Sequence, residues 1–146
     1  MPNWCSNSLV ISTNTEVDID KAREQLKEFR DKVELIEGTF MNNLYPMPKE
    51  LEDTKSPSDD PNWYDWRCDN WGTKWDVEAC LEYDEEDVLE YSFDSAWGPP
   101  TGFIEKVSKD FPLLRFRLKY EEEGNGFLGV AVATNGDLDD QCIEYY

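Results

Sequence analysis

Carboxylates are the most abundant residues that could do chemistry in this sequence, and they concentrate in two segments. Residues 76–97 hold nine acidic residues and no basic one, and residues 121–146 hold seven acidic residues and no basic one. Two roles are open for them: binding a cationic partner, or simply facing solvent. The acidic side chains predicted to face a partner are Glu78, Glu82, Asp84, Glu85, Glu86, Asp87, Glu90, Asp94, Glu121, Glu122 and Glu123.

Catalysis is disfavoured by what these segments lack. Exposed carboxylates have little reason to shift their pKa values, and shifted values mark catalytic acids and bases. The sequence contains no histidine, the commonest general base and metal ligand. Its four cysteines lie far apart without zinc spacing, and the acids near Asp139 do not match a calcium loop. We therefore expect no enzyme activity, no metal and no cofactor.

Tryptophans form the second group of candidate residues. Four of the six tryptophans fall between residues 62 and 76, and a fifth follows within residues 93–100. They could line a pocket that stacks a planar, nucleotide-like ligand, with a few polar groups to orient it. Alternatively, they form a core, since aromatic side chains chiefly supply buried area. The candidate pocket residues are Trp63, Trp66, Asn70, Trp71, Lys74, Trp75 and Trp97.

The net charge of −19 limits the possible partners. It opposes direct binding to nucleic acid or to anionic membranes, both of which require clustered basic residues. A basic surface on another protein is the partner class that fits. The N-terminus does not resemble a secretory signal and no stretch approaches membrane-spanning length, so we expect a cytoplasmic monomer or dimer with reduced thiols.

The elements that must position these residues follow from hydrophobic periodicity. Apolar residues at helical spacing predict helices over 17–33 and 101–111, and alternation predicts strands over 6–13, 77–93 (a hairpin), 114–120 and 127–134, with an edge strand over 142–146. This order predicts one α+β domain, residues 1–146, with a ferredoxin-like split βαβ core. A Trp-rich, partly helical insertion at about 40–75, with its helix over 63–71, and a C-terminal β extension complete it.

The predicted sheet has one face covered by helices and one open face. On the open face, charge would run from the acidic hairpin to Arg115, Arg117 and Lys119. Aligning the apolar positions of the hairpin sets a register that brings like charges together. It places Tyr83 opposite Leu89, Leu81 opposite Tyr91, Glu82 opposite Glu90, and Glu78 opposite Asp94.

Several short blocks resemble the YubB ferredoxin-like domain family, small proteins of bacteria, conjugative plasmids and phages. The blocks are PNWCSN (2–7), PMPKEL (46–51), NWGTKWD (70–76), FDSAWGPP (93–100) and YEEEG (120–124). The resemblance implies the ferredoxin-like core and a mobile-element setting in a bacterial host, and it carries over no catalytic residue. Combined with the charge, it suggests a counter-defence protein that mimics DNA, of the anti-restriction or anti-CRISPR type. The alternative is a nucleotide-like ligand module built on the Trp-rich segment.

Overall fold

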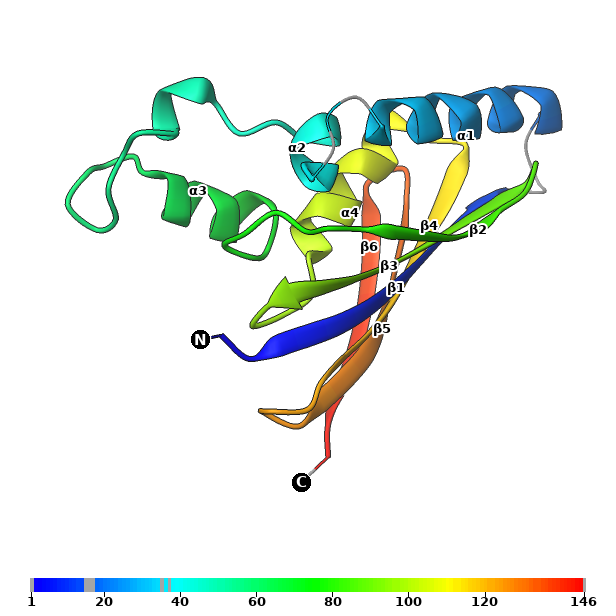
Figure 1. Cartoon of the computed structure of the whole chain (residues 1–146). Helices are drawn as coiled ribbons and strands as arrows, with labels where there is room; N and C mark the ends of the chain where they lie inside the picture. The colour runs from blue at the N-terminus through cyan, green and yellow to red at the C-terminus, as the bar shows by residue number, and fades with distance from the viewer. Residues whose placement is uncertain (1, 15–17, 35, 37, 146) are drawn as a thin grey trace.

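The computed structural model describes residues 2–14, 18–34, 36 and 38–145 (Figure 1). The helices are α1 (Ile19–Val33), α2 (Phe40–Leu44), α3 (Trp63–Asn70) and α4 (Thr101–Asp110), with a 3-10 turn at Lys49–Leu51. The strands are β1 (Trp4–Thr13), β2 (Cys80–Asp84), β3 (Val88–Ala96), β4 (Leu114–Glu122), β5 (Phe127–Thr134) and β6 (Asp137–Glu144).

The strands form one antiparallel sheet in the order β2-β3-β1-β4-β5-β6. The first and second halves of the split βαβ pattern interleave, so β1 lies between β3 and β4. This confirms the predicted α+β class with an antiparallel sheet. It leaves β2 and β6 as the two edges of the sheet, and each carries an exposed cysteine, Cys80 and Cys142.

One face of the sheet carries the core because alternate residues of every central strand point to it. Leu9 and Ile11 of β1 are fully buried there, beside Phe116 and Leu118 of β4. Phe29 of α1 packs its ring against those of Phe40, Tyr91, Phe111 and Phe116 at centroid separations of 5.4 to 6.4 Å. The helices therefore cover a single face, as predicted, and the opposite face is open.

The charge gradient expected on the open face is present in part. Val10 of β1 pairs with Glu90 on one side and with Arg117 on the other, so acidic and basic rows flank the central strand. Beyond β4 the face becomes more apolar, with Val130 37% exposed and Leu128 36% exposed. The basic row is thus a narrow stripe confined to β4.

The β2–β3 hairpin differs from the predicted register. Leu81 does pair with Tyr91, but the register then shifts between Leu81 and Tyr83. Tyr83 consequently pairs with Glu90, and the predicted Glu82–Glu90 and Tyr83–Leu89 pairs are wrong. Glu78 precedes β2, so the predicted Glu78–Asp94 pair lies outside the strand ladder, although the Cys80–Ser92 pair keeps the register that the prediction assumed. The irregularity relieves the like-charge contact: Ser92 donates to Glu82 at 2.6 Å, and Ser8 donates to Glu90 at 3.0 Å.

The C-terminal strand is longer than predicted. Asn135 and Gly136 have φ values of 48° and 82°, which suit the two central residues of a tight hairpin turn. The chain reverses at once, and β6 begins at Asp137 rather than at residue 142. Helix α3 ends at Asn70, one residue before its predicted end. Within the described residues, no helix is long and apolar enough to cross a membrane.

Candidate functional site: an acidic surface around Trp4 and Trp75

Two exposed tryptophans lie together at the start of β1. The rings of Trp4 and Trp75 have centroids 6.0 Å apart and planes 40° apart, and the two residues remain 49% and 38% exposed. The ammonium group of Lys74 lies 4.3 Å from the Trp75 ring centroid, an example of the cation–π contact that such rings offer. Apolar rings left in water beside each other mark this surface as a candidate for binding.

Hollows lined by carboxylates flank Trp4 on both sides. One, of about 360 Å³, is lined by Trp4, Asp76, Val77, Glu78 and Asp94. The other, of about 260 Å³, is lined by Asn3, Trp4, Ser6, Glu121, Glu122, Glu123 and Gly124. No basic residue lines either hollow. The acid–tryptophan surface is defined here as Trp4, Trp75, Glu78, Asp94, Glu121 and Glu123.

The sheet itself brings these acids to Trp4. Ser6 of β1 pairs with Asp94 of β3 on one side and with Glu121 of β4 on the other. Residues two apart on a strand share a face, so Trp4 lies on the same face as Ser6 and its carboxylate neighbours. Acids that are far apart in the sequence thus meet across one strand.

Asp76 lines the first hollow and is held in place by backbone hydrogen bonds. Its carboxylate accepts hydrogen bonds from the backbone N–H groups of Met41, Asn42 and Val77 at 2.7, 3.0 and 2.8 Å. Burial raises the pKa of the Asp76 carboxyl above its ordinary value of 3.8, against the opposing effect of these hydrogen bonds. Asp76 therefore fastens the chain before β2 to the start of α2.

The turn between β4 and β5 forms one side of the second hollow. One residue that was predicted to contact a partner, Glu122, is buried inside this turn. Glu122 is fully buried, and its carboxylate accepts from the Asn125 N–H at 3.0 and 3.1 Å. This residue was expected at the surface, but it stabilises the turn instead. Glu121 accepts from the Tyr145 hydroxyl at 2.7 Å, which raises the pKa of Tyr145 to about 12.

The acids at the β2–β3 turn do not belong to this surface. Arginine side chains of α1 form ion pairs with several of them. Arg30 contacts Asp84 at 2.6 Å, and Arg23 contacts Asp87 at 2.8 Å and Glu86 at 3.5 Å. The Arg23 hydrogen bond lowers the pKa of Asp87. The acids predicted as one patch are thus divided between a paired group, which docks the hairpin on α1, and the acid–tryptophan surface. Glu85 is exposed at the same turn.

The predicted tryptophan pocket is also divided. Trp71 is fully buried, and its indole N–H donates to the Tyr45 carbonyl at 2.9 Å. Trp66 meets Trp71 edge to face, and the Arg67 guanidinium lies 5.2 Å from the ring centroids of both Trp63 and Trp71. Asn70 accepts from the Tyr45 hydroxyl at 2.8 Å and donates to the Trp66 carbonyl. These residues pack together as part of the core and its margin.

Trp97 follows β3 and is 48% exposed, with a φ of 69° that is unusual for a residue other than glycine. Such backbone strain requires compensation by its surroundings. The Trp97 N–H donates to the Asn3 carbonyl at 2.8 Å, next to Trp4. Trp4 was missed in the sequence because it lies outside the Trp-rich segment. Its alternation with Ser6 and Ser8 on the outward face of β1 is the signal that could have found it.

Comparisons with known proteins place the fold in context. The model of a family described as the ferredoxin-like domain in Api92-like proteins matches residues 70–146. The crystal structure of protein Api92 from Yersinia pseudotuberculosis is similar, with a TM-score of 0.63 and 12% identity, over 100% of this chain and 99% of that one. At this identity the likeness shows the fold alone. No curated protein matches the sequence.

Proposed function

This chain belongs to the family of ferredoxin-like domains in Api92-like proteins, and we propose that it acts by binding a basic protein surface, without catalysis. The supporting observation is the pair of carboxylate-lined hollows that flank the exposed Trp4 ring, with no basic residue lining either. The family description names no activity, so the proposal rests on the chemistry of this surface.

Lysine and arginine side chains are the groups that such a surface would recognise. A cation above an indole ring gains about 0.5–2 kcal/mol, and a carboxylate beside it adds charge-assisted hydrogen bonds. Glu78, Asp94 and Glu123 are exposed and available for this contact, whereas Asp84 and Asp87 already have arginine partners on α1. The acid–tryptophan surface is therefore a better docking site than the hairpin turn.

The specific form of this proposal is occupation of a nucleic-acid-binding surface on a bacterial host protein. Two base-free segments in a chain of net charge −19 imitate the negative charge of DNA. The motifs that resemble the YubB family would add a phage or plasmid setting, in which a cytoplasmic counter-defence protein of the anti-restriction or anti-CRISPR type would be useful.

Capture from a bacterial lysate, followed by competition with DNA, tests this proposal. The test variant reverses three surface acids, Glu78→Lys, Asp94→Lys and Glu121→Lys. The control variant reverses three exposed acids elsewhere, Glu24→Lys, Glu50→Lys and Asp53→Lys, so that both variants have the same net charge. We expect the wild type and the control to capture a nucleic-acid-binding protein, and the test variant to lose it.

The same capture experiment is repeated at high salt and in the presence of DNA. Raising ionic strength from about 0.1 M to about 1 M shortens the screening length from roughly 10 Å to roughly 3 Å and should release the partner. Duplex DNA should displace the chain from the captured protein. A partner that binds both variants equally, resists high salt, or holds DNA and this chain together would refute the proposal.

A further inference from the structure

We propose that the edge strand β2 accepts an extended, basic segment of a partner protein as an added strand, whose apolar side chains enter the cleft beneath β2. This cleft adjoins the acid–tryptophan surface and shares Glu78 with it, whereas Trp4, Asp94 and Glu121 do not line the cleft. The inference rests on the proposed function only in taking the partner to be basic.

The first observation is the free edge of β2. This strand ends the sheet order, and all five of its residues, Cys80–Asp84, are exposed. Figure 1 shows β2 at the margin of the sheet, below the helices. No strand in the described part of the chain pairs with its outer side. An edge strand presents unpaired backbone N–H and C=O groups, which an extended peptide can use.

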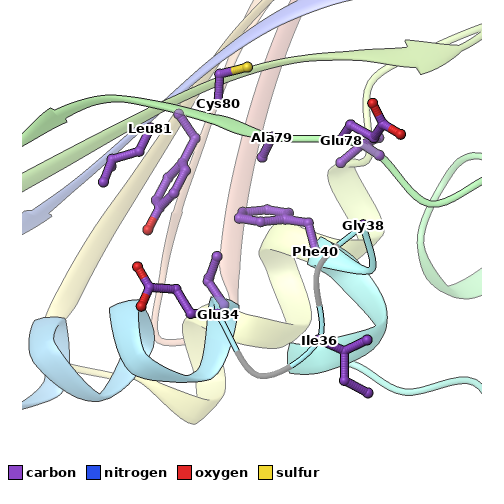
Figure 2. A pocket seen from close by; sticks show the side chains of 11 residues that line it. Glu34, Ile36, Gly38, Phe40, Glu78, Ala79, Cys80 and Leu81 are labelled. Carbon is purple, nitrogen blue, oxygen red and sulfur yellow. The ribbon is translucent and has the colours of Figure 1, made fainter.

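The second observation is a cleft of about 500 Å³ directly beneath that edge. It lies between β2, the end of α1 and the start of α2, and its walls are largely apolar (Figure 2). Figure 2 shows Ala79 on the helix side of the chain and Cys80 pointing to the other side. The apolar lining residues are Val33, Ile36, Phe40, Val77, Ala79, Leu81 and Tyr91.

These two features together define the pattern of the added segment. Side chains of a strand alternate between the two faces of the sheet. Every second side chain of a segment paired with β2 would therefore point into the cleft, beside Ala79 and Leu81. The intervening side chains would lie on the open face, beside Cys80. Affinity would come from backbone hydrogen bonds, and selectivity from the cleft.

Charge selects the occupant. Glu34 and Glu78 line the cleft, Glu82 is exposed on β2, and no lysine or arginine lines the cleft. A second copy of the chain would bring one acidic β2 against another, and like charges across a strand pair are destabilising. In a segment that alternates apolar and basic residues, the apolar side chains would contact the walls of the cleft and the basic side chains would lie near its acidic residues. The register shift between Leu81 and Tyr83 limits pairing to the part of the edge beside the cleft.

Two peptides of equal composition can test this proposal with the full chain. One, of about seven residues, alternates lysine and valine; the other carries the same residues as a lysine block followed by a valine block. Their charges are identical, so simple attraction predicts equal binding. We expect the alternating peptide to bind at least about tenfold more tightly. Hydrogen exchange should slow over residues 79–81, beside the cleft, and remain unchanged over the opposite edge, 137–144.

Variants locate the contact. Ala79→Arg obstructs the cleft and should weaken the alternating peptide about tenfold, as should Leu81→Ala, which removes part of its wall. Val130→Arg, on the open face of β5, should change nothing. Trp4→Ala should leave the preference for the alternating peptide unchanged, because any lysine binding at the acid–tryptophan surface is common to both peptides. Thermal unfolding confirms that each variant is folded. Equal binding of the two peptides, no effect of either cleft variant, or protection of β2 that rises with protein concentration alone would overturn the proposal.

Loss of binding by the Trp4 variant would place the peptide on the acid–tryptophan surface and would also overturn strand addition. The two proposals can therefore fail separately. Reversal of Asp94 and Glu121, which do not line the cleft, examines one surface, and obstruction at Ala79 examines the other.

Discussion

Individual residues of one type have opposite roles here, according to what surrounds them. Trp71 is fully buried with its indole N–H bonded to a carbonyl, whereas Trp75 is exposed beside Trp4. Glu122 is buried within a turn, whereas Glu123 next to it is exposed. Residue type alone therefore identifies which side chains could bind, and the fold decides which of them do.

Trp71→Ala should destabilise the chain by about 3–5 kcal/mol, the cost of removing a large buried side chain and leaving a cavity. Trp75→Ala, the matched control in the same segment, should cost less than about 1.5 kcal/mol, since it removes an exposed ring and one ring pair. Urea unfolding followed by circular dichroism measures both. Equal costs would show that Trp75 is as much a core residue as Trp71.

Asp76 should give the stability a pH dependence of unusual sign. Because its pKa is raised on folding, the folded chain holds this proton more tightly than the unfolded chain. The stability owed to Asp76 therefore falls as pH rises from below 3.8 through the folded-state pKa. Asp76→Asn should remove this pH-dependent contribution to the free energy of unfolding. The stability of the wild type relative to this variant should therefore decrease as pH rises from below 3.8 through the folded-state pKa of Asp76.

Asp87 provides the control of opposite sign. Its pKa is lowered by Arg23, so its contribution is complete above 3.8 and is lost as pH falls toward the folded-state pKa. The stability of the wild type relative to Asp87→Asn should thus increase with pH. Unfolding curves at closely spaced pH values on both sides of 3.8 measure the slope for each variant. The same slope for both variants would contradict the assigned shifts.

Elements are held together where backbones approach closely. The N–H of Phe103 near the start of α4 donates to the carbonyl of Trp71, the residue that follows α3, at 3.1 Å. A Cβ on Gly102 would lie 2.3 Å from the Asn70 carbonyl oxygen. Only glycine allows this approach without a backbone shift, so the contact fixes how α3 and its tryptophans sit on α4.

Gly102→Ala should therefore destabilise the chain by about 1–3 kcal/mol or more through overpacking against backbone. Gly98→Ala is the matched control, because a Cβ there meets nothing within 4 Å. It should be nearly neutral. Thermal unfolding of both variants gives the comparison, and a neutral Gly102→Ala would mean that α3 and α4 can separate without cost.

Periodicity predicts elements better than it predicts the contacts between them. The helical spacing of Ala22, Leu26 and Phe29 anticipated α1, and the alternation from Leu114 onward anticipated β4. The shift at Glu82 could not be predicted from periodicity, and it is accompanied by a hydrogen bond from Ser92 on another strand. The pairing of Trp4 with Trp75, far apart in sequence, likewise depends on how β1 meets the chain before β2.

The whole molecule carries an uneven charge that opposes folding. Its net charge is −19, and arginines of α1 compensate the acids at only one end of the β2–β3 hairpin. Self-repulsion of this kind weakens when salt screens it.

Raising KCl from about 0.01 M to about 0.15 M shortens the screening length from roughly 30 Å to roughly 8 Å. The Tm should increase by a few degrees, since about 1 kcal/mol moves the Tm of a domain of this size by roughly 3 °C. Glu78→Lys combined with Asp94→Lys should reduce the increase. A Tm that falls with salt would mean that ion pairs such as Arg23–Asp87 outweigh the net repulsion.

Two exposed thiols lie at opposite edges of the sheet, so each folded chain can form disulfide bonds with two other copies under oxidising conditions. Cys80 and Cys142 are exposed on β2 and β6. Burial raises the pKa of the Cys5 thiol to about 12 and also raises the pKa of the half-buried Cys68 thiol, which makes both less reactive. Mild oxidation should therefore link copies end to end into a ladder of covalent oligomers on a non-reducing gel. Cys80→Ser should stop the ladder at the dimer, because each molecule then has a single reactive end.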